Sequence, residues 1–237
     1  DVVYIRADGS DSSACTRAAP CATFAHAFQQ LDAQKTIVHV LGGAFSVGSG
    51  TVALPSRTLY IDADDTVIRR ESMGPVFTAA GGSAIFSHVT FSSAQAQNQA
   101  LAISSGQVEL FQCSIPTLLN PTGGTLEVAA SKVDGGGSCS NAGTTLNIHD
   151  SMLSRGFIVG DCNVTYERNR FDFVTNGVAL GGGSGNGVIK IENNVIISSD
   201  YFTDPLNVNG AVGSTVRFNT LVNIGGVDMG ANPLYCN

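Results

Sequence analysis

The hydrophobic and polar residues of this chain recur in an eight-residue pattern. It reads apolar, any residue, apolar, two variable residues, a small or amide residue, any residue and apolar, as in VELFQCSI at 108–115. Clear further copies are LEVAASKV (126–133), LNIHDSML (146–153), VTYERNRF (164–171) and IKIENNVI (189–196), and weaker copies start at Val38, Leu59, Ala84 and Val216. Alternation over the first three positions predicts a short strand with one buried face, and the break after it predicts a bend before a second strand.

Equivalent positions in the copies have the same character, as stacking requires. The third position is apolar or aromatic in every copy, and it comprises Val40, Ile61, Phe86, Leu110, Val128, Ile148, Tyr166, Ile191 and Phe218. The second position is mostly polar and includes His39, Glu109, Glu127, Asn147, Thr165, Lys190 and Arg217. We therefore expect the third position to face the core and the second to face solvent.

The sixth position of the pattern is a bend. It carries Ser131, Ser151, Asn169 and Asn194 in four of the five clear copies. Hydroxyl and amide side chains tolerate a left-handed backbone and can bond neighbouring backbone groups, so this position predicts a polar ladder inside the core. Apolar runs at 100–103, 157–159, 178–180 and 206–208 predict a third strand, each followed by a turn rich in Gly or Ser, such as 181–187.

The distance between successive copies is 18 to 27 residues. A unit of this size cannot bury its apolar face alone, so neighbouring units must stack on it. Parallel strands joined by crossovers strongly favour one hand. The predicted fold is an all-β, single-stranded right-handed parallel β-helix of about nine coils. An all-β sandwich, the main alternative, would show hairpin turns every ~8–12 residues.

Both ends of such a stack need covers, because they expose unpaired strand edges. Phe24, Ala27, Phe28 and Leu31 have the spacing of an amphipathic helix, and Thr23 is its expected N-cap. We predict one domain over residues 1–237. Residues 1–35 form an N-terminal strand, loop and capping α-helix, 36–226 form the coils, and 227–237 form an irregular C-terminal cap.

Composition and charge exclude several classes of protein. Charged residues are only 13% of the chain, and its net charge is -7. Phosphate binding needs clustered Lys and Arg, so a nucleic-acid partner is not expected. No apolar run reaches the roughly 18 residues of a membrane span. No charged-then-apolar leader is present either, so we expect a secreted or surface protein whose signal peptide has been removed.

Six cysteines include no C-x-x-C pair, so zinc ribbons and thioredoxin-like sites are poorly supported. Cys15 and Cys21 flank a loop short enough to close as a disulfide, which favours an oxidising compartment over a cytosolic protein with six buried thiols. Cys139 and Cys162 lie about one coil apart and are the preferred second bridge. Cys113 occupies the bend position and is expected to be a buried thiol.

The opening of the chain carries a family resemblance. YIR at 4–6, GSD at 9–11 and PCATFAHAF at 20–28 give a strand, a Gly/Asp/Ser loop and a capping helix. With IENNVI and ERNRF, this resembles secreted bacterial parallel β-helix proteins of the pectin-lyase-like superfamily over nearly the whole chain. The resemblance implies the fold. It says little of activity, because this architecture hosts lyases, hydrolases, esterases, adhesins and phage spikes.

The resemblance also implies where an enzyme of this kind would carry its catalytic groups: on the third strand and the loops before it. The runs at 157–159 and 178–180 carry no such group, and 206–208 carries only an amide. The preceding loops supply Asp134, Arg155, Asp172, Asp200 and Asp204, with no matching motif. Titratable residues instead gather on the outer face of the first strand. His149, Asp150, Glu167 and Arg168 could form a glycan or acid–base site, although such charge columns usually only stabilise a solvated sheet.

Asp62, Asp64 and Asp65 form the densest acidic cluster. Such oxygen ligands could bind Ca²⁺, but Asp64 is predicted at the bend, where a turn-forming role is favoured. No other cofactor is expected. The glycine runs at 42–43, 135–137 and 181–183 are not followed by the Lys-Ser/Thr and helix of a nucleotide site, so we interpret them as turns.

Three functions remain after sequence analysis. The favoured one is a secreted or cell-surface module, without catalysis, that binds a glycan or another surface polymer. The alternative is a polysaccharide-active enzyme, either a lyase or a glycoside hydrolase, acting on a uronate-containing or similar glycan. A third is an adhesive or structural spacer within a longer surface protein.

Overall fold

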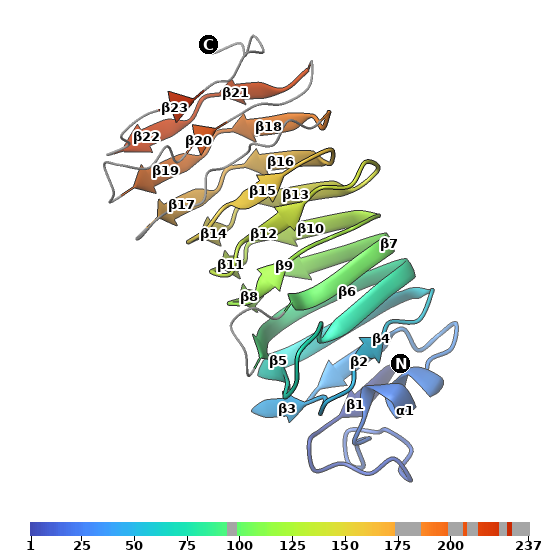
Figure 1. Cartoon of the computed structure of the whole chain (residues 1–237). Coiled ribbons are helices and arrows are strands. Elements are labelled where there is room, and N and C mark those ends of the chain that lie inside the picture. The colour runs from blue at the N-terminus through green and yellow to red at the C-terminus, as the bar shows by residue number, and fades with distance from the viewer. Residues whose placement is uncertain (94–98, 174–185, 199–205, 208–212, 223–226, 229–237) are drawn as a thin grey trace.

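A computed structural model of the chain describes residues 1–93, 99–173, 186–198, 206–207, 213–222 and 227–228. These residues form a parallel β-helix, in which 21 described strands make one continuous sheet that winds through successive coils (Figure 1). The stack has about seven turns, against the nine predicted. Parts of the later coils, including the predicted third strand at 178–180, lie outside the described residues. No helix in the described ranges is long and apolar enough to cross a membrane.

The first strand of each coil lies parallel to the equivalent strand of the coils before and after it. The separate strands of this group are β1 (Val2–Ile5), β2 (Ile37–Val40), β10 (Thr125–Ala129), β13 (Thr145–His149), β16 (Asn163–Glu167), β18 (Ile189–Glu192) and β21 (Thr215–Arg217). Three longer strands continue around bends of the coil, and they are β5 (Thr58–Arg70), β6 (Phe77–Ser93) and β7 (Gln99–Phe111).

Two further groups of strands complete the coils. The second group contains the C-terminal parts of β5 and β6 together with β3 (Ala44–Ser46), β8 (Ser114–Ile115), β11 (Lys132–Val133), β14 (Met152–Leu153), β17 (Arg170–Phe173), β19 (Val195–Ser198) and β22 (Thr220–Val222). The third group contains the N-terminal parts of β6 and β7 with β4 (Val52–Ala53), β9 (Leu118–Leu119), β12 (Gly137–Cys139) and β15 (Phe157–Val159). A separate parallel pair joins β20 (Leu206–Asn207) to β23 (Val227–Asp228).

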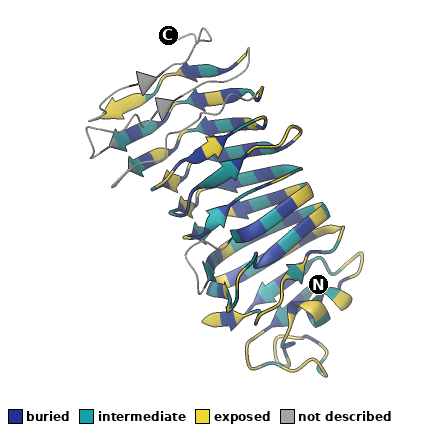
Figure 2. Ribbon diagram, viewed as in Figure 1, coloured by how far each residue is buried: buried dark blue, intermediate teal, exposed yellow. Residues whose placement is uncertain are grey.

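Apolar side chains from the three groups fill the interior of the stack, as the alternation of buried and exposed positions shows (Figure 2). One buried column follows the first strands from coil to coil. It consists of Val3, Val38, Ile61, Phe86, Leu110, Val128, Ile148, Tyr166, Ile191 and Val216. The predicted third-position column is therefore confirmed for the seven copies from Ile61 to Ile191.

The predicted register is wrong by two residues at both ends of the stack. Ile61 pairs with Val38 and not with Val40, and Ile191 pairs with Val216 and not with Phe218. A shift of two residues keeps a strand's inward and outward faces, so alternation alone does not detect it. Phe218 is 63% exposed, because it occupies the left-handed bend and not the strand.

The predicted polar ladder is present at the bend between the first and second strands. The backbone N–H groups of Cys113, Ser131, Ser151, Asn169 and Asn194 each donate to the side-chain oxygen of the next ladder residue, at 2.8–3.0 Å. The left-handed conformation, however, belongs to the residue before the inward-facing bend residue, which is the fifth position and not the sixth in the clear copies. Its members, with φ between 49° and 58°, are Asp65, His88, Gln112, Ala130, Asp150, Arg168, Asn193 and Phe218.

The N-terminal cap is confirmed. Helix α1 (Phe24–Gln29) covers the first coils with Phe24 and Ala27, and the Thr23 hydroxyl caps it by accepting from the His26 N–H group. Both predicted disulfides, Cys15–Cys21 and Cys139–Cys162, are present. At the other end, an irregular cap was predicted over 227–237, but residues 227–228 form β23. The rest of that predicted cap lies outside the described ranges.

Candidate functional site

A shallow groove of about 820 Å³ runs along the stack at the bend between the first and second strands. We call it the turn groove. Three adjacent columns of residues line it: the left-handed residues Asp65, His88, Gln112, Ala130, Asp150 and Arg168, the inward residues Val89, Cys113, Ser131 and Ser151, and the outward residues Thr90, Ser114, Lys132, Met152 and Arg170. The groove therefore crosses six successive coils and is built from equivalent positions in each.

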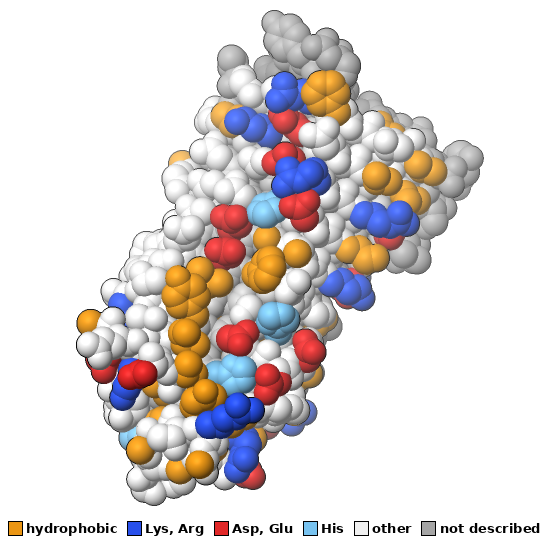
Figure 3. Space-filling model, turned by 180° about the vertical axis from the view of Figure 1, so that it is seen from behind, with side chains coloured by type: hydrophobic (Ala, Val, Ile, Leu, Met, Phe, Trp, Pro, Cys, Tyr) orange, Lys and Arg blue, Asp and Glu red, His pale blue; other side chains and the backbone are white. Residues whose placement is uncertain are grey.

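The bend explains why these side chains line a groove. The left-handed residue of each coil is exposed, whereas the ladder residue after it turns inward. The next residue points outward again, and Thr90, Ser114, Lys132, Met152 and Arg170 pair in that order from coil to coil. Seen from this side, acidic, basic and histidine side chains are interspersed along the stack (Figure 3).

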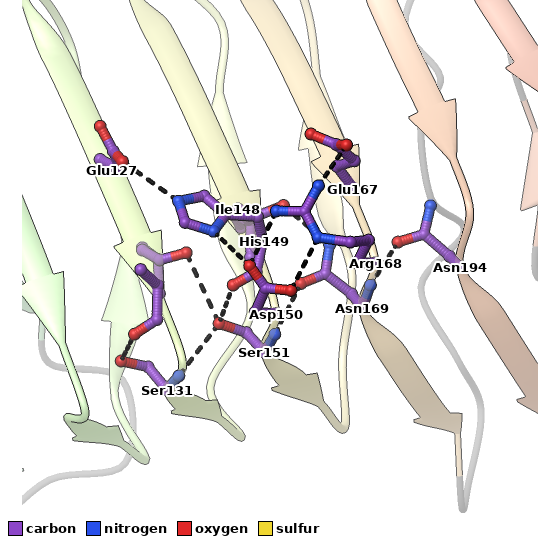
Figure 4. Close-up of polar contacts among 12 residues, drawn as sticks. Glu127, Ser131, Ile148, His149, Asp150, Ser151, Glu167, Arg168, Asn169 and Asn194 are labelled. Atoms are coloured by element: carbon purple, nitrogen blue, oxygen red, sulfur yellow. Dashed lines mark hydrogen bonds and ion pairs between the residues drawn. The ribbon is translucent and has the colours of Figure 1, made fainter.

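His149 lies beside the turn groove and contacts two carboxylates (Figure 4). Its Nδ1 atom lies 2.8 Å from Oδ2 of Asp150, and its Nε2 atom lies 3.1 Å from Oε1 of Glu127 on the preceding coil. Arg168 donates from Nε and Nη2 to the two carboxylate oxygens of Asp150, at 2.8 Å each, and from Nη1 to Glu167. The predicted grouping of His149, Asp150, Glu167 and Arg168 is therefore correct, and Glu127 joins it.

Electrostatics favours the charged forms of His149, Asp150 and Arg168. Burial lowers the pKa of His149, but the hydrogen bonds and charges of Asp150 and Glu127 outweigh it and raise the pKa above its usual value. Hydrogen bonds from Arg168 and His149 hold the pKa of Asp150 well below its usual range. A general base needs a nitrogen lone pair free to accept a proton, and both nitrogens of His149 face carboxylates. The geometry therefore favours an ion-paired histidine.

The raised pKa of His149 predicts a pH-dependent contribution to stability. This contribution is fully present below the ordinary histidine pKa of about 6.5 and is lost as the pH rises through the raised value. We expect His149→Gln to lower the free energy of unfolding at about pH 5.5 and to change it little at about pH 9. Urea unfolding of both proteins at the two pH values measures this. An equal loss at both values would contradict the ion-paired arrangement.

A second histidine–aspartate cluster lies nearer the N-terminus. Asp62 Oδ2 lies 3.1 Å from His39 Nδ1, and Asp62 Oδ1 lies 3.2 Å from His88 Nδ1 and accepts from the Ser87 hydroxyl at 2.6 Å. Burial raises the pKa of Asp62, but the hydrogen bonds from Ser87, His88 and His39 outweigh it and hold the pKa below its usual value. Asp64 contacts the other nitrogen of His39, at 3.3 Å.

The three aspartates of the acidic cluster have different surroundings. The prediction that Asp64 lies at the bend is wrong, and its side chain is exposed. Asp65 is the left-handed residue and Thr66 takes the inward bend position, because this coil has a register shift after Asp62. In the described ranges, only Cys15, Cys21 and His26 bring three metal-ligating atoms within 4.8 Å of one another, and these cysteines are disulfide-bonded. Calcium binding at Asp62, Asp64 and Asp65 stays a prediction.

Two further predictions concern single positions near the groove. Arg217 was placed in the column of Lys190, but it pairs with Glu192, and its Nη2 atom donates to Glu192 Oε2 at 2.9 Å. This follows from the two-residue shift of the last copy. Cys113 is a buried free thiol, as predicted, and burial raises its pKa to about 12. Its side chain fills part of the groove floor and does not supply a reactive thiolate.

The face formed by the third strands differs from the turn groove. Ile158 on β15 is 54% exposed, and the flanking positions of β12 carry only Gly137 and Ser138. Arg155 lies beside this face, in a small hollow of about 280 Å³. The candidate positions 178–180, Asp200 and Asp204 lie outside the described residues.

Comparison with known proteins assigns no relative to this chain. No protein-family model matches it, and searches of curated proteins and of solved structures found no match either. The resemblance to the pectin-lyase-like superfamily, and with it a bacterial source, stays a prediction.

Proposed function

We propose that this protein is an extracellular β-helix that binds an extended glycan, or a similar surface polymer, along the turn groove without cleaving it. The observation that carries the proposal is the groove itself, which presents equivalent positions from six successive coils in one line. Stacked strands repeat every ~4.8 Å, so the groove offers a ligand the same kind of contact at regular intervals. A linear polymer is the ligand class that can use such repetition.

Two observations support an extracellular location. Cys15–Cys21 and Cys139–Cys162 are disulfide-bonded, and structural disulfides persist mainly in oxidising compartments. The opening motif, with its strand, loop and capping helix, is typical of secreted bacterial β-helix proteins of the pectin-lyase-like superfamily. We include secretion from a bacterium and kinship with that superfamily in the proposal.

Binding is favoured over catalysis by the state of the titratable groups. His149 has a carboxylate at each ring nitrogen, and Asp150 is held by both His149 and Arg168. None of these groups is left free to move a proton to or from a sugar. A polysaccharide lyase or glycoside hydrolase is the second candidate, and the superfamily resemblance is what favours it.

The test is a panel of soluble glycans, assayed both for binding and for cleavage. Binding is measured by calorimetry, and cleavage by new reducing ends and by unsaturated products that absorb in the near ultraviolet. We expect at least one glycan to bind with no product formed. Product formation would replace the proposal with the enzyme alternative. An absence of both binding and cleavage across the panel would favour the spacer.

A further inference from the structure

The cations at the outer edge of the turn groove are already paired within the protein. Lys132 Nζ lies 2.9 Å from Asp134 Oδ2, and Asp134 also accepts from the Ser154 hydroxyl at 2.6 Å. Two coils further on, Arg170 donates from Nε to Asp172 Oδ2 at 2.8 Å. Each pair thus joins a cation that lines the groove to a carboxylate that does not line it.

The third cation of the groove is paired more completely. Arg168 uses Nε and Nη2 for both oxygens of Asp150, and Nη1 for Glu167. Such a two-point guanidinium–carboxylate pair fixes the orientation of both groups and leaves few donors for a ligand. The three cations lining the groove are thus matched by Asp134, Asp150, Asp172 and Glu167, within a protein of net charge -7.

Three uncharged polar side chains in the groove, outside the ladder, have no such partner. Thr90, Gln112 and Ser114 line it on adjacent coils, and none has a side-chain hydrogen bond to another described residue. Hydroxyl and amide groups both donate and accept hydrogen bonds, so they can pair with a sugar hydroxyl whether it acts as donor or as acceptor. Thr90 and Ser114 occupy the same position on successive coils, about 4.8 Å apart along the axis.

From these observations we infer that the ligand of the turn groove is a neutral, hydroxyl-rich glycan and not a uronate or sulfated one. The inference rests on the proposed function and specifies its ligand class. An acidic polymer would bring its own carboxylates against Asp150 in the groove and near Asp134 and Asp172. The described cations that line the groove are already paired and offer it no compensating charge. A neutral polymer meets free hydroxyl and amide groups and leaves the ion pairs intact.

The experiment measures affinity for neutral and uronate polymers of matched chain length at low and high salt. For neutral polymers we expect affinity to change less than about twofold between ~20 mM and ~500 mM NaCl, because no net charge attraction is screened. For uronate polymers we expect affinity at least about tenfold weaker at low salt. Tighter binding of the uronate polymers, with affinity falling steeply as salt rises, would overturn the inference.

A charge-switch variant adds a second readout. Asp134→Asn frees Lys132, so we expect it to gain affinity for uronate polymers at low salt by about threefold or more. The matched control is Asp8→Asn, which frees Arg6 from a similar exposed pair in the N-terminal loop and should change nothing. An equal gain in both variants, or no gain in a folded Asp134→Asn, would contradict the inference.

The two proposals fail in different ways. If uronate polymers bind best, without cleavage, the proposed function stands and the neutral ligand class is wrong. If no glycan of either kind binds, both are wrong. The wild-type measurement alone separates these outcomes, so the test survives if Asp134→Asn does not fold.

Discussion

Replacing Asn169 with alanine is expected to lower the free energy of unfolding by about 3 kcal/mol. Asn169 is buried in the ladder, where its Oδ1 accepts from the Ser151 N–H group at 2.9 Å and its Nδ2 donates to the Ile148 carbonyl at 2.7 Å. Alanine leaves both backbone groups without these partners. Each unpaired buried group costs roughly 1–3 kcal/mol, and the lost volume adds to this.

The matched control for this substitution is Asn147→Ala. Asn147 is on the outer face of β13, and its side chain has no hydrogen bond to another described residue. We expect the free energy of unfolding of the Asn147→Ala variant to stay within about 0.5 kcal/mol of the wild-type value. Urea unfolding at one pH measures both variants. Equal effects, or a loss below about 1 kcal/mol for Asn169→Ala, would show that the ladder contributes little to stability.

The central coils could be predicted from the sequence because two periodicities reinforce each other there. Alternation within each strand separates the core face from the solvent face, and recurrence of the same residue types separates coil from coil. From Ile61 to Ile191 both signals agree, and the pairing follows them. At Val38 and Val216 the copies are weak, and a shift of two residues satisfies alternation equally well.

The bend shows a different limit of sequence reasoning. Polar residues at the sixth position correctly predicted a ladder, but the left-handed residue precedes them. The fifth position holds Gln112, Ala130, Asp150 and Arg168, which share no chemistry that would reveal a common conformation. The residue after it turns inward at each of these bends, including at Thr66 and Val89, and the left-handed residue adopts positive φ whatever its side chain.

The candidate site was predictable in part for the same reason. Register alone placed His149, Glu167, Asp150 and Arg168 together, and the structure confirms this. The groove was missed, because it depends on the angle of the bend and on residues such as Ser114 and Lys132 that resemble any surface positions. Their shared seventh position in the repeat was the signal that could have revealed them.

Filling the turn groove is expected to abolish most of its binding. Thr90 on β6 lines the groove, and tryptophan at that position would place an indole where the polymer passes. We expect Thr90→Trp to weaken affinity for the best-binding glycan by about tenfold or more, which is about 1.4 kcal/mol. Aromatic residues are well tolerated in strands, so the fold should persist.

The most direct test of the account compares Thr90→Trp with Thr165→Trp by calorimetry against that same glycan. Thr165 is also a half-buried strand residue, on β16, but it does not line the turn groove. Circular dichroism establishes that both variants are folded. Binding by the turn groove predicts a loss for Thr90→Trp and wild-type affinity for Thr165→Trp. Equal affinity of the two variants would contradict it, because the glycan would then bind elsewhere on the protein.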